Sequence, residues 1–218
     1  RPDVALASMG VYVFDADYLY AALEADARSA GSSRDFGKDL IPAIVARGEA
    51  VAHPFGESCI KSGPEAPTYW RDVGTIDAYH LAHMDLVSVD PEFNLYNRKW
   101  PIFTNQAQLP GAKFTLRGTA EDSIVSNGCI ISGGDVDRSV LSPNVLVDKW
   151  AKVEESVIFS GARIGRNAVV RRAILDKNVI VEDGAEVGVN READLARGFD
   201  VSESGVTVVP KNGRVDNS

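Results

Sequence analysis

Cysteine is scarce in this sequence, and basic residues are outnumbered by acidic ones. The 218 residues include only two cysteines, Cys59 and Cys129, which is too few for a disulfide framework and fits a reducing cytoplasm. The 31 acidic and 23 basic residues give a net charge of −8, which argues against a nucleic-acid partner but not against small phosphate ligands. No apolar run approaches the roughly 20 residues of a membrane helix, and no signal peptide is visible. We therefore expect a cytoplasmic protein that binds neither nucleic acid nor a membrane.

Strand-like and helix-like segments alternate over the first hundred residues. The patterns predict a strand over residues 4–14, helices over residues 17–28 and 36–47, a short strand over residues 49–55, and a helix from Thr75 to about Val89. Such alternation is typical of an α/β domain, but three strands at most are too few for a free-standing sheet of this kind. Because the chain also starts at Arg1 rather than Met, we expect residues 1–100 to be the end of a domain in a longer protein.

Aliphatic residues recur at six-residue steps from Ser123 onward. The steps form triples whose first members, at positions 124, 141, 158 and 175, are 17 residues apart. All twelve positions carry Ile, Leu or Val: Ile124, Ile130, Val136, Leu141, Val147, Val153, Ile158, Ile164, Val170, Leu175, Val181 and Val187. A helix repeats every 3.6 residues and an ordinary strand every 2, whereas a six-residue step fits a parallel β-helix with three short faces per turn. We expect residues 101–218 to hold a linker and a left-handed β-helix of hexapeptide repeats with four stacked coils. A generic β-sandwich is the alternative.

Two pairs of residues near the start of the chain are candidates for a sugar site. Ser8 and Tyr12 are four residues apart, so they would lie on one side of the predicted strand, where a hydroxyl and a phenol can grip a sugar. The alternative is that Tyr12 belongs to the core and Ser8 is a small packing residue. Asp35 and Phe36 lie between a polar loop and a helix, where Asp35 is equally suited to cap that helix.

A third candidate is the segment YWRDVGT, residues 69–75, just before a predicted helix. Aromatic faces beside a carboxylate are common in sugar sites, and Asp72 is also suited to hold Mg²⁺ against a phosphate. The alternative is a surface pair between Arg71 and Asp72, with Trp70 in the core.

Histidine supplies no convincing catalytic or metal site. His80 and His83 are three residues apart on a predicted helix, but no Cys or third His accompanies them, so we expect a surface or packing role. The predicted β-helix contains no histidine, the general base of many hexapeptide-repeat acyltransferases. This argues against acyl transfer.

Four segments resemble the bacterial glucose-1-phosphate adenylyltransferases, in the order VALASMGVYVFDADYL, SSRDFGKDLIP, YWRDVGTIDAYHLAHMDL and NLYNRKWPI. The hexapeptide region is similar to the C-terminal domain of that family, so the resemblance covers essentially the whole chain. It implies that residues 1–100 are the C-terminal portion of a Rossmann-like nucleotidyltransferase domain. It also implies the reaction of ATP with glucose 1-phosphate to give ADP-glucose and pyrophosphate, in glycogen synthesis. The residues that it places in the glucose 1-phosphate site are Ser8, Tyr12, Asp35, Phe36, Trp70 and Asp72, with Asp72 also binding Mg²⁺ beside a ligand outside this chain.

The same resemblance shows which parts of the catalytic machinery have no match here. The family's Gly-rich nucleotide loop, of the type GGxGxRL, and the lysine that binds the sugar phosphate are absent from the 218 residues. We therefore expect the chain alone to hold half of a substrate pocket and to be inactive. Two other interpretations stay open: a non-enzymatic module for oligomerisation and regulation, and a sugar nucleotidyltransferase that uses a different base or sugar.

Assembly and regulation also follow from the resemblance. It implies a homotetramer with allosteric sites where sugar phosphates activate and AMP inhibits. Arg171, Arg172 and Lys177 are interpreted as a basic cluster near one coil corner, with Lys177 at the position of an AMP-contacting Arg in some relatives. Because Lys lacks the bidentate fork of Arg, a solvated basic corner is the alternative.

Overall fold

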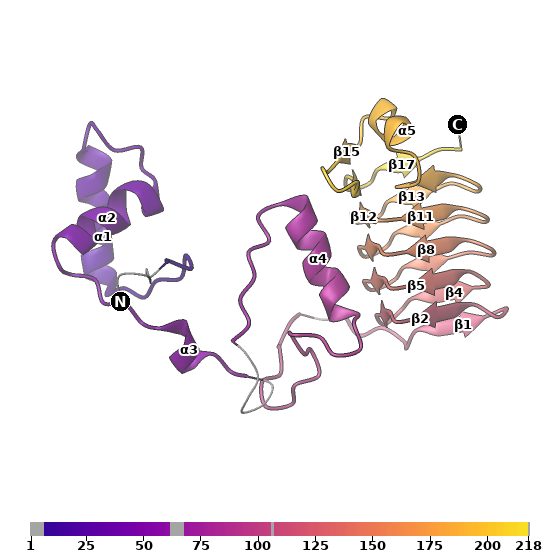
Figure 1. The fold of residues 1–218 in the computed structure, drawn as a ribbon, viewed down its shortest axis with the longest axis horizontal. Helices are drawn as coiled ribbons and strands as arrows, with labels where there is room; N and C mark the ends of the chain where they lie inside the picture. The colour runs from indigo at the N-terminus through magenta and orange to yellow at the C-terminus, as the bar shows by residue number, and fades with distance from the viewer. Residues whose placement is uncertain (1–6, 62–67, 106, 218) are drawn as a thin grey trace. The chain divides into compact units, whose positions relative to one another are not determined.

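The chain forms two compact units in a computed structural model that describes residues 7–61, 68–105 and 107–217. The first unit is Arg1–Ser58 and the second is Cys59–Ser218 (Figure 1). Across the described ranges, no helix combines the length and the apolar character needed to span a bilayer.

The first unit consists of short helices whose ends follow the local sequence. They are α1 (Ala16–Arg28), the π-helical turn η1 (Phe36–Leu40), α2 (Ile41–Ala46) and α3 (Phe55–Ser58). The carboxylate of Asp15 caps α1 by accepting the Tyr18 N–H at 3.1 Å. Gly48 follows α2 with φ of 70°, a conformation that glycine adopts without steric cost. The helices predicted over residues 17–28 and 36–47 are thus confirmed.

The two strands predicted in the first unit do not form within its described residues. Residues 7–14 are irregular chain with a bend at Gly10, they pair with no described strand, and the side chain of Val13 is 97% exposed. Residues 49–54 are irregular, and α3 begins where the second strand was expected to end. Residues 4–6 lie outside the described residues. β-Branched side chains favour an extended backbone, but a strand also needs a neighbour to satisfy its N–H and C=O groups.

The second unit contains the predicted third helix and the β-helix. Helix α4 (Ile76–Leu86) begins at the predicted cap, where Thr75 Oγ1 accepts the Ala78 N–H at 3.1 Å. It ends three residues before the predicted Val89. The described residues from 87 to 112 form turns and irregular chain without helix or strand, and they lead into the first coil.

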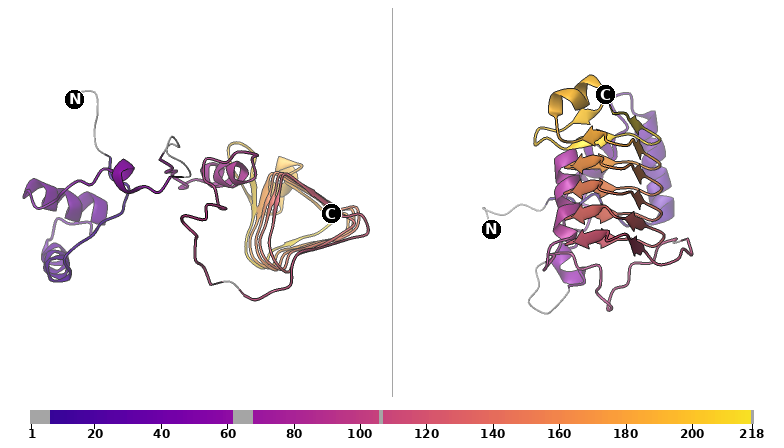
Figure 2. Two further views of the ribbon diagram at one scale, coloured as in Figure 1. Left: turned by 90° about the horizontal axis from the view of Figure 1, so that it is seen from below. Right: turned by 90° about the vertical axis from the view of Figure 1, so that its right-hand side faces the viewer.

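Three parallel sheets form the sides of the β-helix, which has a triangular cross-section when seen along its axis (Figure 2). Face A is β1 (Lys113–Thr115), β4 (Ile130–Ser132), β7 (Leu146–Val147), β10 (Arg163–Ile164), β13 (Ile180–Val181) and β17 (Arg214–Val215). Face B is β2 (Thr119–Glu121), β5 (Asp135–Asp137), β8 (Lys152–Glu154), β11 (Val169–Arg171) and β14 (Glu186–Val187). Face C is β3 (Ile124–Val125), β6 (Val140–Leu141), β9 (Val157–Ile158), β12 (Ala173–Leu175), β16 (Thr207–Val209) and β15 (Asp200–Val201), which is antiparallel to β16. These strands make five coils and the first strand of a sixth, where the sequence predicted four.

Ten of the twelve predicted inward residues form the core of the coils. Each is at most 2% exposed: Val136, Leu141, Val147, Val153, Ile158, Ile164, Val170, Leu175, Val181 and Val187. The predictions for Ile124 and Ile130 are wrong by one residue. Their neighbours Val125 and Ile131 pair with Leu141 and Val147, and Ile131 is fully buried while Ile130 is 40% exposed.

The shift arises at one short corner of the β-helix. The step from Ile130 to Asp135 is five residues, whereas the equivalent step from Leu146 to Lys152 is six. Gly133 and Gly134 make this shorter corner possible. Gly133 is left-handed with φ of 75°, and a Cβ on Gly134 would come within 2.7 Å of the Asp148 carbonyl oxygen.

Each corner is turned by a residue with a left-handed backbone. At the corner from face C to face A these residues are Gly128, Asn144, Gly161, Asn178 and Asn212, all of types that favour turns. The corner from face B to face C instead uses Asp122, Arg138, Glu155 and Arg172, with φ between 41° and 45°. Side chains other than Gly, Asn and Asp are unusual in this region, so stacking against neighbouring coils holds this corner in place.

One excursion interrupts the repeats between β14 and β16. It carries the short helix α5 (Arg191–Ala196), capped by the side chain of Asn190. The carboxylate of Asp194, which is fully buried, fastens the excursion to the coils: it accepts the Gly188 N–H at 2.8 Å and the Thr207 hydroxyl at 2.7 Å, and it pairs with Arg197.

Helix α4 covers the outer side of face C (Figures 1 and 2). The outward ladder of this face is aliphatic in every coil: Ile124, Val140, Val157, Ile174 and Val208. Ile76, Tyr79 and Met84 of α4 pack against it. Face C is therefore buried on both sides at Val157 and Ile174, and the contact explains why α4 belongs to the second unit although the expected domain boundary was near residue 100.

Candidate functional site

Three of the predicted sugar-site residues come together in the first unit. The Ser8 and Tyr12 hydroxyl oxygens lie 2.6 Å apart, so one donates a hydrogen bond to the other. The ring of Phe36 is 5.8 Å from the ring of Tyr12, measured between centroids. Tyr12 is only partly covered, so the alternative in which it is a core residue does not describe this structure. The result is an exposed site with two hydroxyls beside an aromatic face.

Asp35 lies next to this cluster and caps a helix. Its Oδ1 atom accepts the Lys38 N–H at 2.8 Å, while its own N–H donates to Asp39 Oδ2 at 3.0 Å. Both expectations for Asp35 are compatible with this geometry, because the cap uses one carboxylate oxygen and holds the side chain beside Phe36.

Trp70 and Asp72 lie in the second unit, before α4. Trp70 is 55% exposed, and Arg71 pairs with Glu92 at 3.2 Å rather than with Asp72. The alternative of an Arg71–Asp72 pair with a buried Trp70 is therefore wrong. Asp72 Oδ1 accepts the Gly74 N–H at 3.1 Å, which orients an exposed carboxylate at the start of the turn into α4. Trp70 thus offers a ring face to a ligand, and Asp72 offers a carboxylate.

The residues fit a magnesium ion only as a partial site. Among the described residues, no three His, Cys, Asp or Glu side chains come together as a metal site. A single exposed carboxylate is nonetheless a usual protein contribution to Mg²⁺, which takes its other ligands from water and substrate phosphates. Asp72 fits that role with one ligand.

His80 and His83 have structural roles, as expected. Their ring nitrogens lie 2.6 Å from the Glu155 carbonyl oxygen and 2.9 Å from the Tyr79 carbonyl oxygen, respectively. His80 is 3% exposed, and burial lowers its pKa below the ordinary 6.5. Neither ring is directed at a shared metal position.

The three basic residues predicted to cluster at one corner occupy two corners instead. Arg171 and Arg172 lie where β11 passes into β12, whereas Lys177 lies beyond β12, at the corner before β13. Arg171 pairs with Glu154 at 2.7 Å and Arg172 with Glu155 at 3.5 Å. The prediction of one basic cluster is wrong because strand β12 separates the positions, a spacing that the linear sequence does not reveal.

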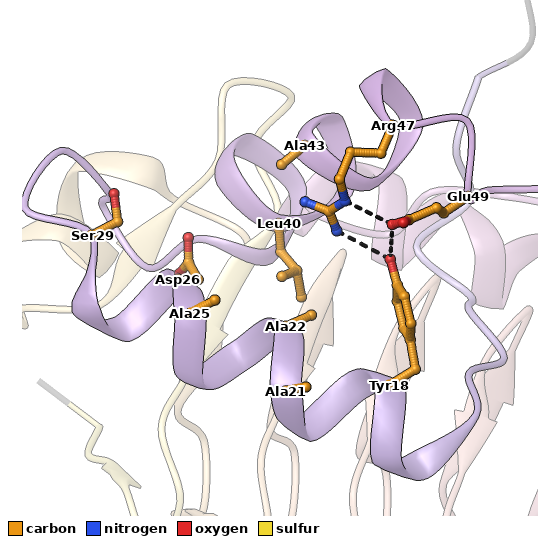
Figure 3. A pocket seen from close by; sticks show the side chains of 10 residues that line it. All are labelled: Tyr18, Ala21, Ala22, Ala25, Asp26, Ser29, Leu40, Ala43, Arg47 and Glu49. Atoms are coloured by element: carbon orange, nitrogen blue, oxygen red, sulfur yellow. Dashed lines mark hydrogen bonds and ion pairs between the residues drawn. The ribbon is translucent and has the colours of Figure 1, made fainter.

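A groove between α1 and α2, not predicted from the sequence, lies in the first unit (Figure 3). Its sides are mostly small: Ala21, Ala22, Ala25 and Ala43, with Leu40. At one end Glu49 accepts hydrogen bonds from the Tyr18 hydroxyl and, at 2.7 Å, from Arg47 Nε. These hydrogen bonds lower the pKa of Glu49, and the bond from Tyr18 has the larger effect. The carboxylate is therefore held ionised and is poorly suited to act as a general base.

Comparisons with known proteins agree with this two-part chain. Residues 1–89 match the family described as nucleotidyl transferase, and residues 107–209 match the family described as GlmU-like, C-terminal hexapeptide. A glucose-1-phosphate adenylyltransferase of Cutibacterium acnes is 56% identical over 210 residues, which are 96% of this chain and 52% of the relative. The chain is homologous to the glucose-1-phosphate adenylyltransferases. Proteins of the same name from Albidiferax ferrireducens and a Parafrankia species are 52% and 54% identical, again over 96% of this chain.

The similarity to these relatives confirms the expected resemblance and the order of its two parts. The chain spans about half the length of the curated glucose-1-phosphate adenylyltransferases that it matches. The six predicted sugar-site residues all fall in the part matched by the nucleotidyl transferase family, and Arg171, Arg172 and Lys177 all fall in the hexapeptide part.

Proposed function

We propose that this chain supplies one side of the sugar-phosphate site of a glucose-1-phosphate adenylyltransferase. The observation that supports it most is the exposed cluster of Ser8, Tyr12 and Phe36, within a segment matched by the nucleotidyl transferase family. In this proposal, the two hydroxyls bind hydroxyls of glucose 1-phosphate, while Phe36 packs against the apolar face of the sugar. Trp70 provides a second ring, and Asp35 and Asp72 provide carboxylates.

The reaction joins an oxygen of glucose 1-phosphate to the α-phosphorus of ATP and breaks the bond to the bridging β-phosphate oxygen. Pyrophosphate leaves with that bonding pair, and ADP-glucose is the product. Magnesium, when bound, neutralises charge on the triphosphate. The residues of this chain bind and orient the nucleophile, which is the main source of rate in such a transfer. Asp72, oriented by the hydrogen bond that it accepts from the Gly74 N–H, would supply one ligand to the metal.

The ATP side of the site is proposed to lie outside these 218 residues. No segment of the sequence matches the GGxGxRL type of nucleotide loop, whose backbone N–H groups would bind the ATP phosphates. The chain alone is therefore expected to be inactive, and a protein of the relatives' full length to be active.

Assembly, regulation and location complete the proposal. A homotetramer is supported by outward aliphatic residues on face A, such as Ile130 and Ile180, which are partly exposed. Sugar-phosphate or AMP control is proposed to use Arg171 and Arg172 at one corner and exposed Lys177 at the next. Two unpaired thiols, Cys59 and Cys129, support a cytoplasmic location.

The proposal is tested by assaying ADP-glucose formation from ATP, glucose 1-phosphate and Mg²⁺. Activity is expected from the full-length protein and not from the 218-residue chain. In the full-length protein, Asp72→Asn should lower kcat strongly, and Ser8→Ala should mainly raise KM for glucose 1-phosphate. Asp90→Asn, at an exposed position near the end of α4, is the control. Near-wild-type kinetics in both site variants would show that this pocket is wrongly assigned. A full-length protein inactive with these substrates would favour the interpretation as an assembly or regulatory module.

A further inference from the structure

Two polar contacts fasten the N-terminal half of α4 to the β-helix, in addition to the apolar packing on face C. Asp77 Oδ1 accepts a hydrogen bond from the Ser204 hydroxyl at 2.7 Å, and its Oδ2 atom lies 3.4 Å from the Ser204 nitrogen. One turn further along α4, His80 contacts the Glu155 carbonyl at 2.6 Å. Apolar packing allows a helix to slide, whereas a carboxylate that receives two donors from one residue sets the position of the helix along its axis.

Contacts within the β-helix also hold Ser204 in place, independently of α4. It lies in the excursion between β14 and β16, where Arg172 Nη2 donates to its carbonyl oxygen at 3.0 Å. Arg191 donates to the neighbouring Ser202 carbonyl at 2.7 Å, and the Gly205 N–H closes a turn onto the same oxygen at 3.1 Å. The loop therefore presents a preformed pair of donors.

Asp77, the partner of Ser204 in this contact, lies close in sequence to the proposed substrate-binding residues Trp70 and Asp72. It is the second residue of α4, whose cap is Thr75. The preceding turn is closed by the bond from the Gly74 N–H to Asp72 Oδ1. Thus Asp72 and Trp70 are five and seven residues before Asp77, joined to it by a capped helix start and a hydrogen-bonded turn.

We propose that Asp77 and Ser204 are positioning residues for the glucose 1-phosphate site. Their contact fixes the first turn of α4 on the excursion, and the first turn of α4 fixes where Asp72 and Trp70 stand. The β-helix thereby contributes to substrate binding without touching the substrate. Hydrogen bonds from Ser202 and Ser204 also lower the pKa of the Asp77 carboxyl, so the acceptor stays ionised at neutral pH. The inference rests on the proposed function, because it assigns Asp72 and Trp70 to that site.

The test uses Ser204→Ala and Asp77→Ala in the full-length protein, singly and together. Ser204→Thr keeps the hydroxyl and serves as the rescue variant. Glu203→Gln, at the exposed neighbouring position, is the matched control. Two quantities are measured: amide hydrogen exchange over residues 69–79, and the separate KM values for glucose 1-phosphate and ATP.

We expect faster exchange over residues 69–79 in the alanine variants and a KM for glucose 1-phosphate raised by about threefold to tenfold, the usual effect of one lost hydrogen bond. The KM for ATP and the melting temperature should stay near wild type. The double variant should behave like either single one, because all three break the same contact.

Three outcomes would overturn the inference: unchanged exchange, unchanged KM for glucose 1-phosphate, or parallel shifts of both KM values with the melting temperature, as a purely structural role would give. A wild-type protein that forms no ADP-glucose would instead overturn the proposed function, and the exchange data would still report whether the contact holds α4.

Discussion

The Nε2 atom of His80 lies 2.6 Å from the carbonyl oxygen of Glu155, at a corner of the β-helix. A carbonyl oxygen only accepts, so Nε2 is the donor, and the neutral ring is the Nε2–H tautomer. Protonation would add a charge to a buried ring that also faces Arg172 and His83. Burial is the main reason that the pKa of His80 is lowered, with Arg172 and His83 adding to it and Glu155 opposing it.

His80 should make the stability of the second unit depend on pH. Because its folded pKa lies below the unfolded value of 6.5, the unfolded chain binds the proton more readily. This contribution is therefore complete above pH 6.5 and is lost as the pH falls below it. We expect a lower melting temperature at pH 5 than at pH 7.5. His80→Gln can still donate to the Glu155 carbonyl but cannot titrate, so it should reduce the difference in melting temperature between pH 5 and pH 7.5. If the variant shows the same difference as the wild type, other groups, such as carboxylates, cause the pH dependence.

Val153→Asp should unfold the β-helix, whereas Glu154→Lys should be tolerated. Val153 is fully buried on the inward ladder between Val136 and Val170, so a carboxylate there would lack any partner. The cost is several kcal/mol, comparable to the whole stability of a domain. Glu154 points outward. Its replacement by Lys removes only a half-exposed ion pair with Arg171, which contributes about 1 kcal/mol or less to stability. Circular dichroism melts compare the two, and equal melting temperatures would refute the inward register of β8.

Gly188→Ala should destabilise the excursion far more than Gly198→Ala. Both glycines are left-handed, with φ of 75° and 81°, so both substitutions carry the same backbone strain of about 1–2 kcal/mol. A Cβ on Gly188 would also overlap the carbonyl oxygen of Arg171, whereas nothing lies within 4 Å of a Cβ on Gly198. The difference between their melting temperatures isolates the steric effect, and similar values would mean that β14 does not approach Arg171 this closely.

Asp194→Ala should loosen the excursion and the last coil. The substitution leaves the Gly188 N–H, the Thr207 hydroxyl and the Arg197 guanidinium without their acceptor, at a cost of roughly 3–5 kcal/mol. Glu192→Ala, an exposed position in the same helix, controls for helix propensity. Limited proteolysis should cut the Asp194 variant within α5 and its flanking loops. Protection equal to that of the control would argue against this anchoring role.

The inward ladder was predictable from the sequence because it depends on local spacing and on one buried side chain per strand. The two errors, Ile124 and Ile130, occur where the next residue is also aliphatic. At Ile124–Val125 and Ile130–Ile131, the composition cannot show which side chain points inward. Only pairing with the next coil distinguishes them, and the short corner at Gly134 shifts that pairing by one residue.

The outward ladder of face C is visible in the sequence, but spacing alone does not show what covers it. Val140, Val157 and Ile174 each precede an inward residue, so these strands are aliphatic on both sides. Strands that are buried on both faces have consecutive aliphatic residues, so this pattern predicts that another part of the chain packs on the outer face. It does not identify α4, and the contact between Asp77 and Ser204, 127 residues apart, leaves no local trace at all.

The length of the excursion indicates where segments can be deleted from or inserted into the β-helix. Ala173 pairs with Thr207, 34 residues later, which is twice the 17-residue step between Val153 and Val170. Cutting out 17 residues after β14 would therefore join it directly to β16 with every aliphatic side chain still in phase. Because each coil takes its alignment from the hydrogen bonds to the coil below, the same corner should accept a foreign loop or a small guest domain of almost any length. The β-helix can thus serve as a rigid scaffold that carries inserted segments while the register of its coils stays unchanged.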